Sequence, residues 1–132
     1  MKIKIIIVLL LLVFFMIGCS EQPLSVEGAY VCKSINENSS PDELPNIFPA
    51  DITDIYLSVK VKNITPDDQL KIKWTYLDTG DIIEEQTSSV DRKGSGYISF
   101  NISISEGFPA GKYKAEVFLN QELTEEINFS VQ

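Results

Sequence analysis

Hydrophobic and polar residues alternate along most of the second half of the chain. In the clearest run, Ile55, Leu57, Val59 and Val61 alternate with polar or aromatic residues. A period of two residues is typical of a β-strand that has one face in a core and the other in water. The same period recurs over residues 70–76, 98–104, 113–120 and 123–131. We therefore expect each of these runs to form a half-buried strand.

Segments rich in Gly, Pro, Asn and Asp separate these runs and predict turns. Two further runs, Ala29 to Ser34 and Ile82 to Ser88, bring the expected number of strands to about seven. The segment from Ser39 to Asn46 begins like a helix, but Pro45 and Pro49 would end it within two turns. The pattern predicts an all-β domain, and short strands at regular intervals favour a β-sandwich.

The first 18 residues differ from the rest of the chain. Two lysines precede an apolar run of 13 residues, Ile5 to Ile17, which has the length of a signal peptide and is too short to span a membrane. The sequence Met16-Ile17-Gly18-Cys19 then resembles the lipobox of bacterial lipoproteins. This resemblance implies that residues 1–18 are removed and that Cys19 becomes a lipidated N-terminus. An ordinary secretory signal with a nearby cysteine is the alternative.

Residues 19–28 are polar and have no periodicity, so we expect a flexible tether before a single domain over residues 29–132. The lipobox resemblance implies that this domain faces the extracytoplasmic side of a bacterial cell membrane. Acyl chains would hold it there, since each buried methylene contributes about 0.8 kcal/mol. The sequence does not distinguish an inner from an outer membrane.

Residues 29–132 resemble immunoglobulin-like domains at two places. Trp74 lies in the third expected strand, where that family buries a tryptophan between its sheets. Residues 109–115 (PAGKYKA) resemble the family's Asp-x-Gly-x-Tyr-x-Cys segment. This resemblance implies that Tyr113 is a tyrosine corner, with a buried ring and a hydroxyl bonded to the backbone. Ala115 replaces the disulfide cysteine, so we expect an immunoglobulin-like β-sandwich of antiparallel strands without an inter-sheet disulfide.

The end of the chain also resembles the closing hairpin of uncharacterised bacterial lipoprotein domains. In that pattern a glycine follows the residue at Asn120, whereas here Gln121 follows it. Because a side chain at Gln121 resists a positive φ, the pattern leaves the type of turn open.

Charge and composition exclude several kinds of function. The chain has 19 acidic and 11 basic residues and a net charge of −8, and the part after residue 18 carries −10 because Lys2 and Lys4 precede it. This charge argues against nucleic acid as a partner, since phosphate binding needs a basic patch. The absence of histidine excludes His-dependent acid–base catalysis, Ser-His-Asp triads and His-ligated zinc. We expect no enzymatic activity, no cofactor and no metal.

Three other features carry candidate chemistry. Cys32 has no disulfide partner if Cys19 is acylated, and we expect it to be a small buried side chain rather than a reactive thiol. The segment from Lys93 to Gly96 lacks the spacing of a phosphate loop and predicts a turn. Adjacent carboxylates in a strand point to opposite faces, so we expect paired carboxylates to be solvated, although the pair in a turn could help to bind calcium. These pairs are Asp67-Asp68, Glu84-Glu85 and Glu125-Glu126.

Outward-facing aromatic residues are the candidates for a binding surface. Tyr56, Tyr97 and Phe118 each stand beside an inward-facing apolar residue, and aromatics on an outer face often mark a contact. The alternative is that the segment from Ile35 to Asp54 covers them. That segment has no regular period but contains Leu44, Ile47, Phe48 and Ile52.

The sequence favours a lipid-anchored, extracytoplasmic, non-enzymatic module that binds another envelope protein or a surface ligand. One rival is an accessory or catalytic protein that acts on envelope glycans through carboxylates. Another is a periplasmic metal or redox protein that uses Cys32. Two carboxylates facing each other in one cleft would favour the first rival, whereas an apolar patch on one sheet would favour the binding module.

Overall fold

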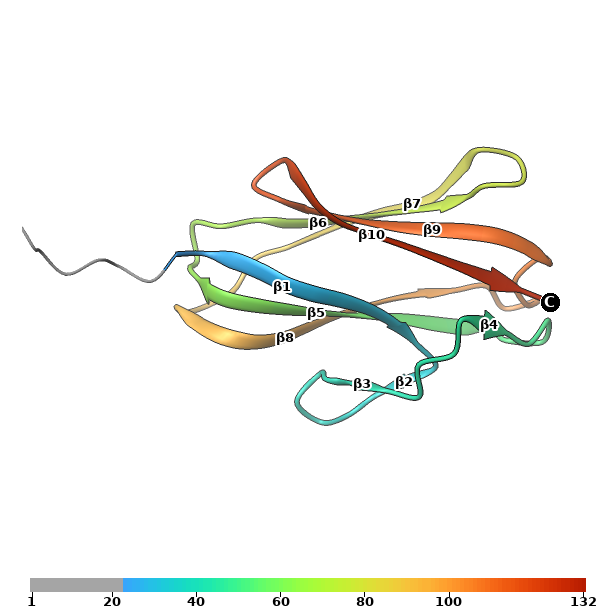
Figure 1. Cartoon of the computed structure of the whole chain (residues 1–132), viewed down its shortest axis with the longest axis horizontal. Coiled ribbons are helices and arrows are strands. Elements are labelled where there is room, and N and C mark those ends of the chain that lie inside the picture. Colours follow the sequence, from blue (N-terminus) through green and yellow to red (C-terminus); the bar gives the residue numbers. More distant parts are fainter. Residues whose placement is uncertain (1–22) are drawn as a thin grey trace, which may run out of the picture.

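The computed structural model describes residues 23–132, which form a sandwich of two β-sheets (Figure 1). The predicted signal peptide (residues 1–18) and Cys19 lie outside the described residues, so both remain predictions. Within residues 23–132, no helix is long and apolar enough to cross a membrane. The strands are β1 (Ser25–Cys32), β2 (Ser34–Ile35), β3 (Pro41–Asp42), β4 (Ile47–Phe48), β5 (Asp54–Ile64), β6 (Leu70–Tyr76), β7 (Asp81–Ser88), β8 (Gly94–Ser103), β9 (Gly111–Leu119) and β10 (Glu122–Val131).

One sheet has three strands in the order β1-β5-β8, and the other has five in the order β4-β10-β9-β6-β7. Neighbouring strands run antiparallel except β4, which pairs with β10 in parallel. The chain crosses between the two sheets before and after β4 and again after β5, β7 and β8. Of the turn expected from Lys93 to Gly96, only Lys93 lies in the inter-sheet connection, which bends at Asp91 and Arg92. Gly94 and Gly96 already belong to β8 and pair with Ile64 and Val61 of β5. The seven long strands match the seven runs expected from the sequence and confirm an immunoglobulin-like β-sandwich.

The inward positions of the alternating runs fill the space between the two sheets. Burying these side chains removes apolar surface from water, which stabilises the fold by roughly 25 cal/mol for each Å². The largest side chains that are fully buried are Trp74, Tyr113, Phe48, Ile55, Leu57, Leu70, Ile72 and Ile102.

The first strand begins inside the segment that was expected to be a tether. Residues 25–28 belong to β1, with Ser25 opposite Lys62 and Gly28 opposite Lys60 on β5. A bulge between Val26 and Gly28 interrupts the two-residue period, which explains why the sequence pattern does not reveal this part of the strand. Residues 25–28 therefore belong to the β-sandwich rather than to a tether.

The helix-like segment from Ser39 to Asn46 forms no helix. β2 and β3 pair as a short hairpin there, and Ser39 has a φ of 65°. The Ser58 hydroxyl, on the outer face of the three-stranded sheet, donates a hydrogen bond of 2.6 Å to the Ser39 carbonyl. This tertiary contact holds the segment against the sheet and outweighs a helical tendency of less than two turns.

Trp74 lies in the core as predicted and takes part in a polar bridge between the sheets. Its indole Nε1–H donates to Gln86 Oε1 at 2.9 Å, and Gln86 Nε2 donates to the Asn101 carbonyl at 2.7 Å. Because Gln86 lies on β7 and Asn101 on β8, the bridge joins the two sheets. Ala115, opposite Trp74 on β9, is fully buried at the position that the immunoglobulin-like resemblance aligns with a disulfide cysteine.

Tyr113 forms the predicted tyrosine corner. Its hydroxyl donates to the Pro109 carbonyl, and its ring stacks on Phe129 at a centroid distance of 5.4 Å. Burial, more than its neighbours, raises the pKa of Tyr113 to about 12. Gly111 has a φ of 147°, and a Cβ at that position would lie 2.6 Å from Asp78 Oδ2. The corner therefore requires glycine at position 111.

The β9–β10 turn corrects one expectation. Asn120 and Gln121 have φ values of 49° and 73°, as in a type I′ turn, so Gln121 adopts the positive φ that its side chain was expected to resist. Asn120 Oδ1 accepts a hydrogen bond from the Gln69 N–H, and Asn120 Nδ2 donates to Asp68 Oδ1, both at 2.9 Å. These bonds to the β5–β6 loop hold the turn in its conformation.

Candidate functional site

The structure separates the three aromatic residues that were predicted to form a binding surface. Tyr56 on β5 and Tyr97 on β8 lie on the outer face of the three-stranded sheet, and Phe118 on β9 lies on the outer face of the five-stranded sheet. All three side chains are half-buried. The three residues therefore do not share one contiguous surface.

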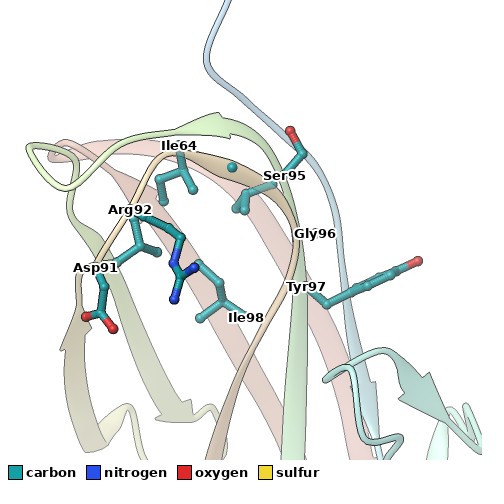
Figure 2. Close-up of a pocket in the computed structure, with 10 residues that line it drawn as sticks. Ile64, Asp91, Arg92, Ser95, Gly96, Tyr97 and Ile98 are labelled. Carbon is teal, nitrogen blue, oxygen red and sulfur yellow. The ribbon is translucent and has the colours of Figure 1, made fainter.

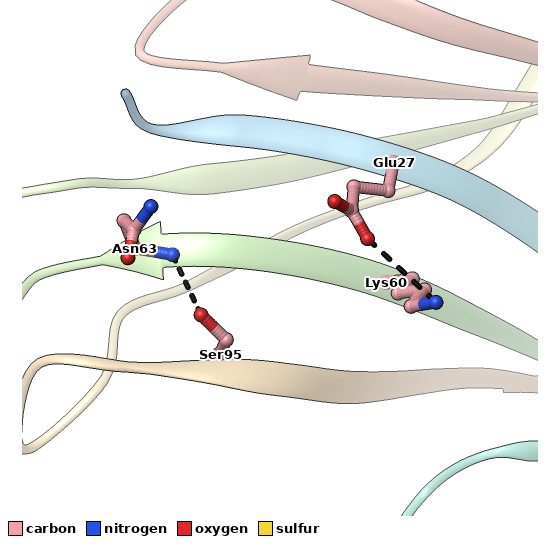
Figure 3. A network of polar contacts seen from close by, with 4 residues as sticks. All are labelled: Glu27, Lys60, Asn63 and Ser95. Carbon is pink, nitrogen blue, oxygen red and sulfur yellow. Dashed lines mark hydrogen bonds and ion pairs between the residues drawn. The ribbon is translucent and has the colours of Figure 1, made fainter. Parts of the chain in front are cut away.

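Lysine side chains lie beside two of these aromatic rings. Lys60 Nζ is 6.0 Å from the Tyr97 centroid, and Lys71 Nζ is 5.7 Å from the Phe118 centroid. Such cation–π contacts contribute about 0.5–1 kcal/mol at exposed sites. Lys60 also forms an ion pair of 3.6 Å with Glu27 on β1 (Figure 3). The two rings thus belong to local surface networks.

The segment from Ile35 to Asp54 covers part of the outer face of the three-stranded sheet. Ser39 contacts Ser58 through its carbonyl and Ser99 through its hydroxyl, at 2.6 and 3.3 Å. Ser58 and Ser99 lie opposite each other in the centre of this face. The covered centre leaves little room for a ligand on this face.

Cys32 is a buried side chain, as predicted. It has no solvent-exposed surface, and its thiol donates to the Tyr56 carbonyl at 3.8 Å. Burial is the main cause that raises the pKa of the thiol. A raised pKa disfavours the thiolate, which is the form that reacts and binds metals. Cys32 therefore fits a packing role.

The predicted pair Asp67-Asp68 lies in the β5–β6 loop. Asp68 accepts hydrogen bonds from Asn120 Nδ2 and from the Thr65 N–H and hydroxyl, and these bonds hold the pKa of its carboxyl below the usual value. They connect the loop to the β9–β10 turn, so Asp68 has a structural role. Among the residues that the structure describes, no three His, Cys, Asp or Glu side chains are grouped closely enough to hold a metal ion.

Two other carboxylates share a hollow in front of β5, where Asp51 and Asp54 lie near Lys33. Hydrogen bonds from the Ser103 and Thr53 hydroxyls lower the pKa of Asp54. A general acid for glycoside cleavage needs a raised pKa, so Asp54 is poorly suited to donate a proton.

The outer face of the five-stranded sheet carries most of the exposed large hydrophobic side chains. Of six such residues in the described chain, four lie on or beside this face, and the exposed fractions are 55% for Ile47, 40% for Leu77, 52% for Ile82 and 47% for Leu123. Strand pairing places Ile47, Ile82 and Leu123 opposite outward-facing residues of the neighbouring strands. Sequence periodicity did not single out these residues, because it does not say which outward positions remain uncovered.

A groove of about 460 Å³ lies at the end of this face where β10 finishes. Ile47 and Leu77 provide its exposed apolar residues, and its polar groups include the side chains of Lys112, Asn128 and Ser130. Lys112 takes part in none of the ion pairs found among the described residues. The groove therefore offers apolar contacts and an available ammonium group.

A second pocket, of about 250 Å³, lies at the opposite end of the sandwich, where the chain enters β1 (Figures 1 and 2). Residues from β5, β8 and the β7–β8 connection line it. Apolar side chains form much of its wall, and Arg92 supplies a positive charge. Its apolar residues are Val61, Ile64, Val90 and Ile98.

No family model matches this sequence, and no curated protein matches it. Solved structures share its fold at low identity. An immunoglobulin-like protein from Pseudomonas aeruginosa is 12% identical with a TM-score of 0.55, over 86% of this chain and 100% of that one. The C-terminal domain of wzt is 13% identical with a TM-score of 0.51, over 86% of this chain and 76% of that one.

The alkylpurine DNA glycosylase AlkC from Pseudomonas fluorescens is 14% identical with a TM-score of 0.51. The match covers 91% of this chain and 33% of AlkC, so the chain spans about a third of that protein's length. Similarity at such low identity concerns the fold alone. By structure, the chain is an immunoglobulin-like β-sandwich.

Proposed function

We propose that this protein is a lipid-anchored, non-enzymatic binding module on the extracytoplasmic side of a bacterial cell membrane. The outer face of its five-stranded sheet contacts another envelope protein. The observation that carries this proposal is that, of the six exposed large hydrophobic residues in the described part of the chain, four lie on or beside that face. Single exposed apolar residues are ordinary, whereas an unequal distribution that favours one face is consistent with a protein contact on that face.

Charged residues between the apolar ones would give such a contact its specificity. On this face Lys71 pairs with Glu85 at 3.4 Å, and Lys114 pairs with Glu116 at 3.5 Å. The Lys71–Glu85 pair is exposed, and because an exposed ion pair contributes little to stability, these two groups can exchange partners at low cost. Complementary charges on a partner would select the correct protein and orient it.

The anchor part of the proposal is supported by the lipobox resemblance at Met16 to Cys19. The domain follows the proposed lipid attachment closely, because Ser25 is already in β1. The rival function on envelope glycans rests on the hollow that Asp51 and Asp54 share, where the lowered pKa of Asp54 does not suit a general acid. A redox or metal function for Cys32 conflicts with the burial of its thiol.

Two substitutions test the proposed surface in cells. Ile47→Asn and Leu77→Asn together place polar groups on the groove, and Leu44→Asn is the control because Leu44 is 57% exposed in the β3–β4 connection. We expect the double variant to lose its crosslinked envelope partner while the control keeps it and both melt like the wild type. Equal crosslinking of the double variant and the control would refute the proposed surface.

A separate experiment tests the anchor. Mass spectrometry of the mature protein extracted from membranes should find an acylated N-terminal Cys19, and Cys19→Ala should leave an unprocessed or mislocalised precursor. An unmodified N-terminus, or a mature chain that starts at another residue, would refute the anchor.

A further inference from the structure

The pocket around Arg92 combines one guanidinium with apolar walls. Arg92 is the only arginine in the chain. Figure 2 shows its guanidinium pointing into the space between Ile64 and Ile98, apart from the carboxylate of Asp91. No ion pair among the described residues involves Arg92. The pocket can therefore offer a planar, unpaired cation to a ligand that also has an apolar part.

Hydrogen bonds connect the rim of this pocket to the start of the described chain. The Asn63 N–H donates to Ser95 Oγ, which lines the pocket, at 2.9 Å (Figure 3). Asn63 Nδ2 donates to the Pro23 carbonyl at 3.1 Å. Cys19 precedes Pro23 by four residues, which span at most about 14 Å when fully extended. A lipid on Cys19 would thus hold the pocket close to the headgroups of the bilayer.

Positively charged residues at this end of the domain favour the binding of an anionic group beside Arg92. Lys93 follows Arg92, and Lys62 lies opposite Ser25 at the start of β1. Acidic residues lie here too: both carboxylate oxygens of Asp68 already accept hydrogen bonds within the domain, and the carboxylate of Asp91, which also lines the pocket, points away from the guanidinium (Figure 2). Since the chain after residue 18 carries −10, it has no general attraction to an anionic bilayer. Contact would depend on the guanidinium, which can bind two phosphate oxygens at once.

We propose that this pocket binds the phosphate of an anionic phospholipid in the membrane that holds the anchor. The Arg92 guanidinium binds the phosphate oxygens, and the partly exposed side chains of Val90 and Ile98 contact the glycerol and the first acyl methylenes. This inference rests on the proposed lipid anchor. It fixes the orientation of the domain, because the groove beside Ile47 lies at the opposite end and would face away from the bilayer (Figure 1).

Because the chain has one arginine, nitrogen-15 arginine labelling gives a single Nε–H resonance that reports on Arg92. We would record it for the mature, membrane-extracted protein in lipid nanodiscs of phosphatidylcholine, with and without phosphatidylglycerol. The resonance should shift only when phosphatidylglycerol is present, and a gadolinium-chelating headgroup lipid should broaden it. An identical resonance in both kinds of disc would overturn the inference.

Variants separate a specific site from general charge effects. Arg92→Gln should weaken the binding of phosphatidylglycerol vesicles at least tenfold, Arg92→Lys should restore part of it, and Lys33→Gln, the same charge change just after the far end of β1, should leave it unchanged. Equal losses for Arg92→Gln and Lys33→Gln would overturn the site. A resonance that responds to inorganic phosphate but not to phosphatidylglycerol would also overturn it.

Intact-mass measurement on the same sample distinguishes the two proposals. An acylated Cys19 together with an unresponsive Arg92 would leave the proposed function standing and refute the lipid pocket. A chain without an acyl group would refute the anchor, whatever the Arg92 resonance does, and the inference would then fail with it.

Discussion

Replacing Tyr113 with phenylalanine removes the hydroxyl that closes the tyrosine corner and leaves the ring in place. The hydroxyl donates to the Pro109 carbonyl, and the loss of one such hydrogen bond costs about 0.5–1.5 kcal/mol. Pro109 is exposed, so water can hydrate its carbonyl in the variant. We therefore expect Tyr113→Phe to lower the free energy of unfolding by about 1 kcal/mol at pH 7.

The pKa of Tyr113 makes this difference depend on pH. The folded pKa is about 12, whereas an unfolded tyrosine has a pKa of about 10. The stability that comes from the neutral hydroxyl is present in full below pH 10 and is lost as the pH rises toward 12. At pH 11, ionisation in the unfolded wild type alone costs it about 1.4 kcal/mol. The wild type should then be no more stable than Tyr113→Phe.

Urea unfolding of a soluble form that begins at Ser20, followed by the fluorescence of Trp74, measures both free energies. The slope against urea should be the same in both proteins. A stability difference that stays constant between pH 7 and pH 11 would show that the Tyr113 hydroxyl is not held in the protonated, buried state described here.

Three further substitutions test the loops and turns. Gly111→Ala should lower the free energy of unfolding by more than about 1 kcal/mol, because position 111 has a φ of 147° and a Cβ there would lie 2.6 Å from Asp78 Oδ2. An unchanged melting temperature would mean that this turn accepts a side chain without strain. Gln121→Gly should raise the free energy of unfolding by about 1 kcal/mol, seen as a higher urea midpoint, because it removes the cost of a side chain at a φ of 73°. A loss of stability would argue against the type I′ turn. Hydrogen bonds lower the pKa of Asp68 in the folded protein, so its ionised carboxylate stabilises the fold above about pH 4. This stabilisation is lost as the pH falls through the folded pKa. Asp68→Asn should be less stable at pH 7 by about 1 kcal/mol and lose less stability on acidification, whereas parallel acid-unfolding curves would contradict this role.

The long strands could be predicted because each has one face in the core, which imposes a period of two on the sequence. Trp74 and Tyr113 were recognised because their local motifs depend on a few residues close in sequence. The two-residue strand Ile47–Phe48 carries no period and forms only because β10 provides an edge for it. The β2–β3 hairpin likewise depends on the distant Ser58.

The binding surfaces were harder to predict for a related reason. Alternation shows that Tyr56 and Phe118 face outward, but it does not show that they lie on different sheets. The residues around Arg92 come from strands and a connection that are distant in sequence, so only the fold brings them together. Gln86 carries no such signal in the sequence either, because a two-residue period groups it with the outward-facing Ile82, and only a bulge in the β6–β7 pairing turns it inward to Trp74.

Site-specific photo-crosslinking tests the proposed contact surface most directly. A photoreactive side chain would replace Ile47 or Ile82, at opposite edges of the five-stranded sheet, or Tyr30, which is 38% exposed on the other sheet. In cells that make the full chain, Ile47 and Ile82 should give crosslinks to the same envelope protein, and Tyr30 should give none. Crosslinks to that protein from Tyr30 alone, or with equal yield from all three positions, would contradict the assignment of the five-stranded sheet as the binding face.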